Sequence, residues 1–384
     1  MRVALLNITA GGMSGGYRKF LINMIPRLAS HPGIDALLCA SPASLRVQDW
    51  FKNIPKVDFI ECRRYDLLGN ITHSADPKLR LALDHFSPDI IFVPVDRQYR
   101  YKNVPVVNMI QNIEPLEEDF DGDPFVGRIR KRVQRASAKK AATGSDRVIA
   151  ISEFVRGFLV NAWNIPPAKI SLIYHGGHSP IEPGHNDAPA SVPPDWKGRF
   201  LFTAGSIRPA RGLEDVLHAM MELLPESAIA GLVIAGDTTP DMVRYREKLD
   251  KWVKSRGLSG RVCWAGNLNE HQMAWCYRNC SVFVMTSRVE SFGMIGVEAM
   301  AHGCVCIVAD NSCLPEIFGD AAVYYSPKDG KALAEAVRDV LSWDNSRRAA
   351  MSEKARKRSE TFSWDVTAEK TMETLNDTLS SMGA

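Results

Sequence analysis

The sequence lacks the features that mark several large classes of protein. No apolar run reaches the roughly 18 residues that a membrane-spanning helix needs. The eight cysteines form no C-x-x-C pair, which argues against zinc sites and disulfides and favours reduced, buried thiols. A formal net charge of only +3 gives no reason to expect a nucleic-acid partner. Neither a repeat of solenoid period nor a long low-complexity tract is present.

The sequence does have the composition of an ordinary globular protein. Its 384 residues, of which 45% are hydrophobic and 24% charged, suffice for two domains. Residues 1–8 are too short and too early for the apolar region of a signal peptide, so they predict a buried first strand. We therefore expect a cytoplasmic protein.

Short apolar segments rich in β-branched residues alternate with longer segments of helical periodicity. The short segments are apolar throughout, which is typical of parallel strands buried on both faces of a sheet. The expected strands are 3–8, 90–95, 104–110, 148–151, 200–204, 232–235, 262–265, 282–285 and 305–309. Helices are expected at 213–224 and 294–302. This βαβ alternation predicts an α/β, doubly wound fold.

One segment interrupts the alternation. Residues 179–197 are rich in proline, lack periodicity and are interpreted as a linker. The linker separates a domain at 1–178 from a domain at 198–361. We expect two Rossmann-like domains that face each other across a cleft, with ligands bound at the carboxyl ends of the strands.

The most informative stretch follows the expected strand at 282–285. A polar loop, 288–291, leads into a helix that begins near Gly293. The free N–H groups and the positive dipole at a helix start predict an anion site. Glu290 precedes the helix and Glu298 lies within it, where their carboxylates could accept hydrogen bonds from hydroxyl groups. The alternative is one exposed glutamate in a turn and another on a helix face.

A basic loop follows the expected strand at 200–204. It contains Gly205, Arg208 and Arg211 and leads into the helix at 213–224. Two arginines in such a loop could clamp a diphosphate and stabilise the charge that develops as a bonded group departs. The alternative is a solvated basic turn.

Glycines also follow the first strand. Gly15 and Gly16 lie in the stretch 10–19, and a glycine loop after a first strand suggests close approach to a phosphate. The loop half-matches a dinucleotide-binding fingerprint, with Asp35 near the acidic position. A tight turn without a ligand is the alternative.

Residues 125–140 form a basic segment with seven lysines and arginines and no acidic residue. As a helix, the segment either contacts anionic lipid or a phosphate-bearing acceptor, or it presents a solvated face. Asp121-Gly122-Asp123 spells a metal-binding D-x-D pattern. An acidic approach to the helix explains this pattern better, so no metal is expected.

The loops and their flanking strands resemble the retaining family 4 glycosyltransferases of the GT-B fold. The mark of that family is two glutamates separated by seven residues, which Glu290 and Glu298 match, with Phe292-Gly293 after the first and Ala299-Met300-Ala301 after the second. The resemblance covers nearly the whole chain and is strongest from 198 to 327. It implies that the last helix, within 362–384, crosses back to the N-terminal domain.

The resemblance also implies roles for individual residues in binding a nucleotide-sugar donor. Glu290 would contact the transferred sugar and Glu298 the ribose. The family's loop is usually basic at the positions of Ser206 and Arg211, and Arg208 could replace the charge missing at Ser206. Other implied contacts of the donor are the main chain of Phe292, Gly293, Met294 and Ile295, the base contacts Asn267 and Leu268, and either Gly15 or Gly16. Gln111 and Asn112 stand where many relatives carry a histidine, which favours amide hydrogen bonds to the sugar or acceptor over general-base work.

The implied reaction moves a sugar from a UDP-, GDP- or ADP-sugar to a hydroxyl of a glycan, lipid-linked or small-molecule acceptor, as in glycan or surface polysaccharide biosynthesis. Arg208, Arg211 and the start of the helix would bear the charge of the leaving diphosphate. No cofactor and no metal is obligatory in this scheme, and anomeric configuration is retained. Two alternatives are a GT-B nucleotide-sugar epimerase or hydrolase and a dinucleotide-dependent oxidoreductase built on the glycine loop.

Overall fold

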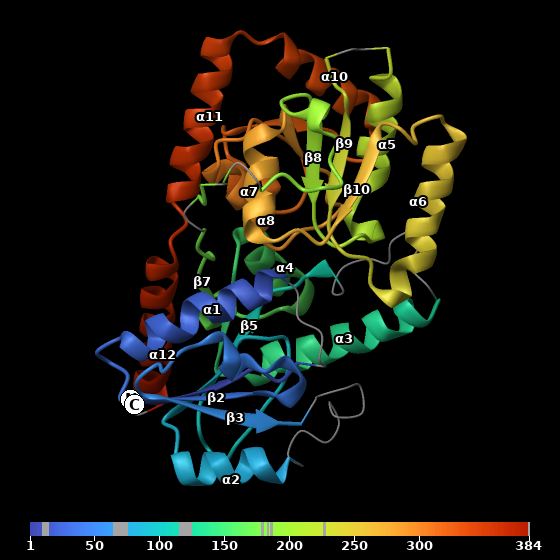
Figure 1. Cartoon of the computed structure of the whole chain (residues 1–384). Coiled ribbons are helices and arrows are strands. Elements are labelled where there is room, and N and C mark those ends of the chain that lie inside the picture. The colour runs from blue at the N-terminus through green and yellow to red at the C-terminus, as the bar shows by residue number, and fades with distance from the viewer. Residues whose placement is uncertain are drawn as a thin grey trace. The chain divides into compact units, whose positions relative to one another are not determined.

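A computed structural model describes residues 1–9, 15–63, 76–114, 125–177, 180–182, 184, 187–225 and 228–382. The chain forms two compact units, which are described separately (Figure 1). The first unit comprises the described residues of 1–114 and 126–176, together with 363–382 from the far end of the chain. The second unit comprises residue 125 and the described residues of 177–362.

The first unit is built on a parallel sheet whose described strands have the order β3-β2-β1-β4-β5-β6-β7. The strands are β1 (Arg2–Leu6), β2 (Ala36–Pro42), β3 (Val57–Cys62), β4 (Ile90–Val93), β5 (Val106–Ile110), β6 (Arg147–Ala150) and β7 (Ile170–Leu172). The helices are α1 (Gly15–Ser30), α2 (Pro77–Phe86), α3 (Phe125–Gly144), α4 (Glu153–Trp163) and α12 (Trp364–Met382). Every residue of β4 and β5 is buried, as expected for strands covered on both faces.

The second unit repeats this plan with the strand order β10-β9-β8-β11-β12-β13, again all parallel. The strands are β8 (Phe200–Ala204), β9 (Gly231–Ala235), β10 (Val262–Gly266), β11 (Val282–Met285), β12 (Cys306–Ala309) and β13 (Ala322–Tyr325). The helices are α5 (Leu213–Glu222), α6 (Val243–Ser255), α7 (Glu270–Asn279), α8 (Met294–Ala301), α9 (Leu314–Phe318), α10 (Gly330–Ser342) and α11 (Asn345–Glu360). Both sheets grow outward in two directions from their first strand, which is the order of a doubly wound Rossmann-type sheet.

The strands predicted from the apolar segments are confirmed, with ends that differ by no more than two residues. Burial explains this success, because each of these strands except β10 is almost wholly covered. Strand β3 lies at the edge of its sheet and is only partly buried, so its sequence carries no continuous apolar run. The predicted helices at 213–224 and 294–302 are α5 and α8.

The last helix, α12, belongs to the first unit, as predicted. It packs beside α1 (Figure 1), where Met372 and Leu375 are fully buried and Arg27 pairs with Asp365 at 2.6 Å. Gly176 makes the junction possible, because a side chain on it would overlap Trp364 at the start of the helix. The chain therefore returns to its N-terminal unit after completing the second unit.

The structure describes parts of the predicted linker and the backbone of the basic segment. Within the predicted linker, Trp196 is buried in the second unit and lies over Gly231, which has no side chain to block it. The basic segment forms helix α3, on which Lys139 and Lys140 are exposed. Contact of this helix with lipid stays a prediction, as do the domain boundaries. The D-x-D pattern at 121–123 lies outside the described residues.

Candidate functional site

The strand order of the second unit locates a site at the carboxyl ends of β8 and β11. These neighbouring strands mark the switch point of the sheet, because the chain continues from β8 to one side and from β11 to the other. The loops that leave such a pair of strands diverge and open a crevice, where doubly wound proteins bind ligands. The two loops here are 205–212 and 286–293, which are the two loops that the sequence predicted to bind an anion.

Arg211 and Glu290 meet at this switch point. Nη1 of Arg211 donates hydrogen bonds to Oε2 of Glu290 at 2.5 Å and to Oγ of Ser287 at 3.1 Å. Ser287 Oγ also donates to Oε2 of Glu290 at 3.2 Å. The two charged side chains are only 19% and 18% exposed, so solvent screens them less than a surface pair. Among the described residues, Nε and Nη2 of Arg211 have no hydrogen-bond partner, and both can donate to an anion.

Backbone contacts hold the two loops against each other. Thr286 Oγ1 donates to the carbonyl oxygen of Arg211 at 2.6 Å, and the Arg288 N–H donates to the carbonyl oxygen of Ala210 at 2.7 Å. The Arg211 side chain lies over Gly205, where a Cβ atom would be 2.8 Å from its Nε. The position of the Arg211 guanidinium is therefore fixed from both sides of the crevice. Arg208 and Ser206 lie earlier in the same loop and are half-buried.

A buried ion pair lies directly beneath these loops. Nη1 and Nη2 of Arg288 donate to Oδ2 and Oδ1 of Asp215 at 2.5 and 2.6 Å, and Asp215 is only 2% exposed. Tyr325 Oη and the Lys328 N–H each donate to Oδ2 of Asp215 at 2.9 Å. Burial, with the charge of Asp215, raises the pKa of Tyr325 well above its ordinary value, so its hydroxyl stays protonated and donates. This cluster joins α5, the loop after β11 and the end of β13.

Helix α8 begins at the same edge of the sheet. Its first N–H groups, on Met294 and Ile295, receive no side-chain cap from the described residues. The residue before the helix, Gly293, has φ = 84° and ψ = 46°, a left-handed conformation that a residue with a side chain adopts only at a cost. The Glu290 N–H donates to Ser312 Oγ at 3.0 Å, which positions the residue just ahead of this turn. The helix start thus offers N–H groups and a positive dipole to an anion.

Glu298 lies one to two turns further along α8 and is 8% exposed. Burial, followed by the charge of Glu298, raises the pKa of the neighbouring Tyr277 well above its ordinary value. Phe292 is buried against the ring of Phe362, at a centroid distance of 5.3 Å. The contact of Glu298 with a ribose stays a prediction.

At the ends of β9 and β10, main-chain groups form the rest of this carboxyl edge of the second sheet. The Gly236 N–H donates to the carbonyl oxygen of Gly266 at 2.7 Å, and the Gly205 N–H donates to that of Ala235 at 2.9 Å. Gly236 has φ = 141°, and a Cβ atom on it would overlap the carbonyl of Gly205. Asn267 and Leu268 follow β10, the first exposed and the second half-buried. The contact of Asn267 and Leu268 with the nucleotide base stays a prediction.

The first unit has its own switch point, between β1 and β4. Gly15, which is exposed, and Gly16, which is half-buried, open α1 after β1, although residues 10–14 lie outside the described part of the chain. Gln111 follows β5 and donates from Nε2 to the carbonyl oxygen of Pro94, after β4, at 2.9 Å. Asn112 is exposed, and its Oδ1 accepts from the Glu114 N–H at 3.2 Å. Polar groups thus gather at the carboxyl edge of this sheet as well.

Two Rossmann-type sheets on one chain, with a last helix that returns to the first unit, define the class of GT-B glycosyltransferase folds. The family model described as "Glycosyltransferase Family 4" matches residues 14–176, and the model "Glycosyl transferases group 1" matches residues 186–358. The chain belongs to the family 4 glycosyltransferases.

Named relatives agree with this membership over part of their length. A lipopolysaccharide core biosynthesis mannosyltransferase of Rhizobium leguminosarum bv. viciae is 29% identical over 201 residues, which cover 51% of this chain and 54% of the relative. A D-inositol 3-phosphate glycosyltransferase of Kineococcus radiotolerans is 26% identical over 293 residues, which cover 71% of this chain and 66% of the relative. The chain therefore spans between half and two thirds of the length of these curated relatives.

Solved structures share the fold of the whole chain. The Anabaena protein HepE in complex with UDP and glucose has a TM-score of 0.74 at 17% identity and covers 98% of this chain and 100% of its own. The glycosyltransferase WaaG, involved in lipopolysaccharide biosynthesis, has a TM-score of 0.69 at 13% identity, with 97% and 99% covered. Within the described residues, none of the helices combines the length and the apolar character needed to span a bilayer.

The structure brings together some predicted site residues and adds others. It joins Arg211 to Glu290 and sets both beside the start of α8, as the sequence suggested. Sequence reasoning did not assign a role to Ser287, which bonds to both, nor to Ser312. The position of Ser287, at the carboxyl end of a central strand, could have indicated that it belongs to the site. The Asp215–Arg288 pair gave no comparable signal, because an aspartate in the first turn of a helix ordinarily faces solvent.

Proposed function

We propose that the protein is a retaining glycosyltransferase that moves a sugar from a nucleoside-diphosphate-sugar to a hydroxyl group of an acceptor. The observation that carries this proposal is the contact between Arg211 and Glu290 at the switch point of the second sheet. A cation that can hold a diphosphate and a carboxylate that can hold sugar hydroxyls thus lie side by side. Their common attachment to Ser287 keeps both groups aimed at one small volume.

The donor diphosphate would occupy the space between Arg211 and the start of α8. Nε and Nη2 of Arg211 would donate to its oxygens from one side, with Arg208 contributing charge from the same loop. The N–H groups of Met294 and Ile295 would donate from the other side, where Gly293 presents no side chain to block a close approach. Glu290 would accept hydrogen bonds from the sugar, and Glu298 would accept from the ribose. The base would lie against Asn267 and Leu268, while Gly15 or Gly16 of the first unit would approach the phosphates or the sugar.

In the reaction, the bond between the anomeric carbon and the diphosphate oxygen breaks as the acceptor oxygen forms a bond to the same carbon. The electron pair of the broken bond stays on the diphosphate, whose growing negative charge Arg211 and the α8 N–H groups stabilise. The proton of the acceptor hydroxyl passes to the departing phosphate oxygen on the same face of the sugar, which accounts for retention without a protein nucleophile. Gln111 and Asn112 would hold the acceptor or sugar through amide hydrogen bonds.

The relatives suggest which donors and acceptors to examine first. The name of one describes a mannosyltransferase of lipopolysaccharide core biosynthesis, and the name of another a glycosyltransferase acting on D-inositol 3-phosphate. A structural neighbour was solved with UDP and glucose. We therefore propose a hexose donor carried on UDP, GDP or ADP, with UDP examined first, and a glycan or phosphorylated polyol acceptor in carbohydrate biosynthesis.

The experiment that tests this function begins with a thermal-shift screen of UDP-, GDP- and ADP-sugars, because a ligand of the folded state raises the unfolding temperature. Transfer to candidate acceptors is then followed by mass spectrometry, and the anomeric configuration of the product by NMR. Arg211→Gln should abolish most of the transfer, whereas the exposed control Arg244→Gln should retain it. If no nucleotide-sugar shifts the unfolding temperature, or if the donor is consumed equally fast without any acceptor, the transferase proposal fails.

A further inference from the structure

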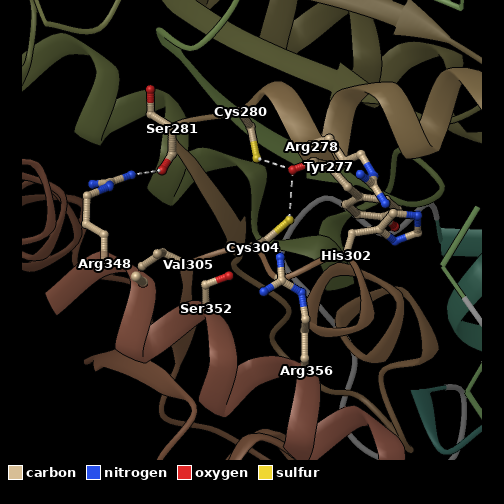
Figure 2. A pocket seen from close by; sticks show the side chains of 12 residues that line it. Tyr277, Arg278, Cys280, Ser281, His302, Cys304, Val305, Arg348, Ser352 and Arg356 are labelled. Atoms are coloured by element: carbon tan, nitrogen blue, oxygen red, sulfur yellow. Dashed lines mark hydrogen bonds between the residues drawn. The ribbon is translucent and has the colours of Figure 1, made fainter. Parts of the chain in front are cut away.

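A second cavity lies at the opposite edge of the second sheet, away from the carboxyl ends of its strands. It has a volume of about 370 Å³. Ser281 and Val305, which immediately precede β11 and β12, form part of its wall, and His302 and Gly303 at the end of α8 form another part. Helices α7 and α11 contribute the remaining sides (Figure 2). The volume falls in the range of cavities that bind small molecules.

Guanidinium groups dominate the lining of this cavity. Arg278 enters from α7, and Arg348 and Arg356 enter from α11 (Figure 2). Among the lining residues, all of which lie in the described part of the chain, none carries a carboxylate. The carboxylates that pair with two of these arginines stand outside the lining: Glu182, 79% exposed, bonds to Arg278, and Glu353, 55% exposed, is 3.9 Å from Arg356. The cavity is therefore positively charged.

The positions of the arginines suit recognition of an anion. Arg348 is held in place because it donates to the carbonyl oxygens of Ser281 at 2.7 Å and Val340 at 2.9 Å. Arg356 reaches into the cavity over Gly303, where any side chain would overlap its guanidinium. Ser352 stands beside it, with its Oγ 2.6 Å from the place where a Cβ on Gly303 would lie. The Arg356 guanidinium and the Ser352 hydroxyl thus lie over the same spot at Gly303, while Arg348 is held against the Ser281 carbonyl at the cavity wall (Figure 2).

We propose that this cavity is a second anion site, which binds the phosphate group of a small phosphorylated molecule. Arg356 and Arg278 donate to the phosphate oxygens, Ser352 adds a hydroxyl donor, and Arg348 supplies fixed positive charge at the wall. The site is separate from the proposed donor site. Strands β11 and β12 and helix α8 run from one to the other, with Ser281 and His302 at the cavity and Glu290 and Gly293 at the far edge.

Calorimetric titration with inorganic pyrophosphate tests the proposal on the 384-residue chain. Because the donor site also takes a diphosphate, the titration is run in wild type and in an Arg211→Gln background. We expect the Arg211→Gln chain to bind one pyrophosphate still, and Arg356→Gln added to it to weaken that binding about tenfold or more. The matched control is Lys357→Gln, which removes one positive charge from the next residue of α11, outside the cavity. It should change the affinity less than twofold.

A vesicle-binding experiment tests whether the phosphate belongs to a lipid headgroup, and two outcomes of these measurements would contradict the proposal. Sedimentation with phosphatidylglycerol vesicles that is lost in Arg356→Gln but kept in Lys357→Gln would assign the phosphate to a lipid headgroup. Equal weakening by the two substitutions, or no binding to pyrophosphate or vesicles in the Arg211→Gln chain, would overturn the proposal. Circular dichroism of each variant checks that its fold is intact. Neither result bears on the transferase activity, because Arg356 is not part of the donor site.

Discussion

Asp215 and Arg288 form a buried two-point ion pair, with N–O distances of 2.5 and 2.6 Å, beneath the loop that carries Glu290. Asp215 accepts from both terminal nitrogens of the guanidinium, Nη1 and Nη2, and also from Tyr325 Oη and the Lys328 N–H. Removing only one partner of such a pair strongly destabilises the fold, because the other charge stays buried without compensation. The pair thus determines where the loop after β11 lies.

Asp215→Asn should therefore lower the free energy of unfolding by about 3–5 kcal/mol, because Arg288 would remain buried without a counter-charge. Urea denaturation followed by circular dichroism measures the change. Asp365→Asn is the control, since it removes an ion pair with Arg27 at 2.6 Å whose aspartate is 83% exposed. The control should cost less than about 1 kcal/mol. Comparable losses in the two variants would show that the buried pair does not anchor the loop.

Gly236→Ala should disturb the edge of the second sheet where the donor is proposed to bind. Its φ of 141° excludes a side chain on conformational grounds, and the added Cβ would overlap the carbonyl of Gly205. We expect a loss of more than about 1 kcal/mol in stability and weaker binding of the nucleoside diphosphate. Gly260→Ala is the control, because nothing lies within 4 Å of its added Cβ. A Gly236→Ala variant as stable as the control would contradict the close packing of Gly236 on Gly205.

The sequence predicted the fold well because the strands are covered on both faces and leave continuous apolar segments. Strands β2, β3, β7 and β13 were not among the expected strands. The last three are edge strands with partly exposed residues, and β2, although buried, contains no β-branched residue. For the site, the glutamate spacing and the basic loop singled out Glu290 and Arg211, which the structure brings into contact, while their roles stay predictions. Their direct contact could not be predicted, because it depends on how two loops 79 positions apart pack on neighbouring strands. The buried pairing of Asp215 with Arg288 escaped for the same reason.

Stability in acid should depend on His175. This side chain is 2% exposed, its ring lies 5.2 Å from that of Phe20 and 5.6 Å from that of Trp364, and burial lowers its pKa to about 3. In the unfolded chain the imidazole gains a proton below about pH 6.5, whereas in the folded chain it stays neutral until about pH 3. The stabilisation is therefore complete above pH ~6.5 and is lost as the pH falls, by up to about 1.4 kcal/mol per pH unit.

The measurement is the free energy of unfolding between pH 4 and 7 in wild type, His175→Phe and His85→Phe. His175→Phe should make the free energy of unfolding depend less steeply on pH. The number of protons taken up on unfolding should fall by about one, because no group at this position then gains a proton. His85→Phe alters an exposed histidine and should leave the slope as it is in wild type. An unchanged slope in His175→Phe would mean that His175 is not held neutral by burial.

The central claim is that Arg211 binds the diphosphate of the donor while Glu290 acts on the sugar. Its most direct test measures two quantities in both Arg211→Gln and Glu290→Gln. These are the Kd of the nucleoside diphosphate and the kcat of transfer from the donor found by the screen. Arg211→Gln should weaken the nucleoside diphosphate about tenfold or more and reduce kcat/KM by about 10²–10³. Glu290→Gln should leave the Kd within about threefold and lower kcat by a factor of about 10² or more. Wild-type transfer by either folded variant, or loss of nucleoside-diphosphate binding in Glu290→Gln alone, would contradict the account.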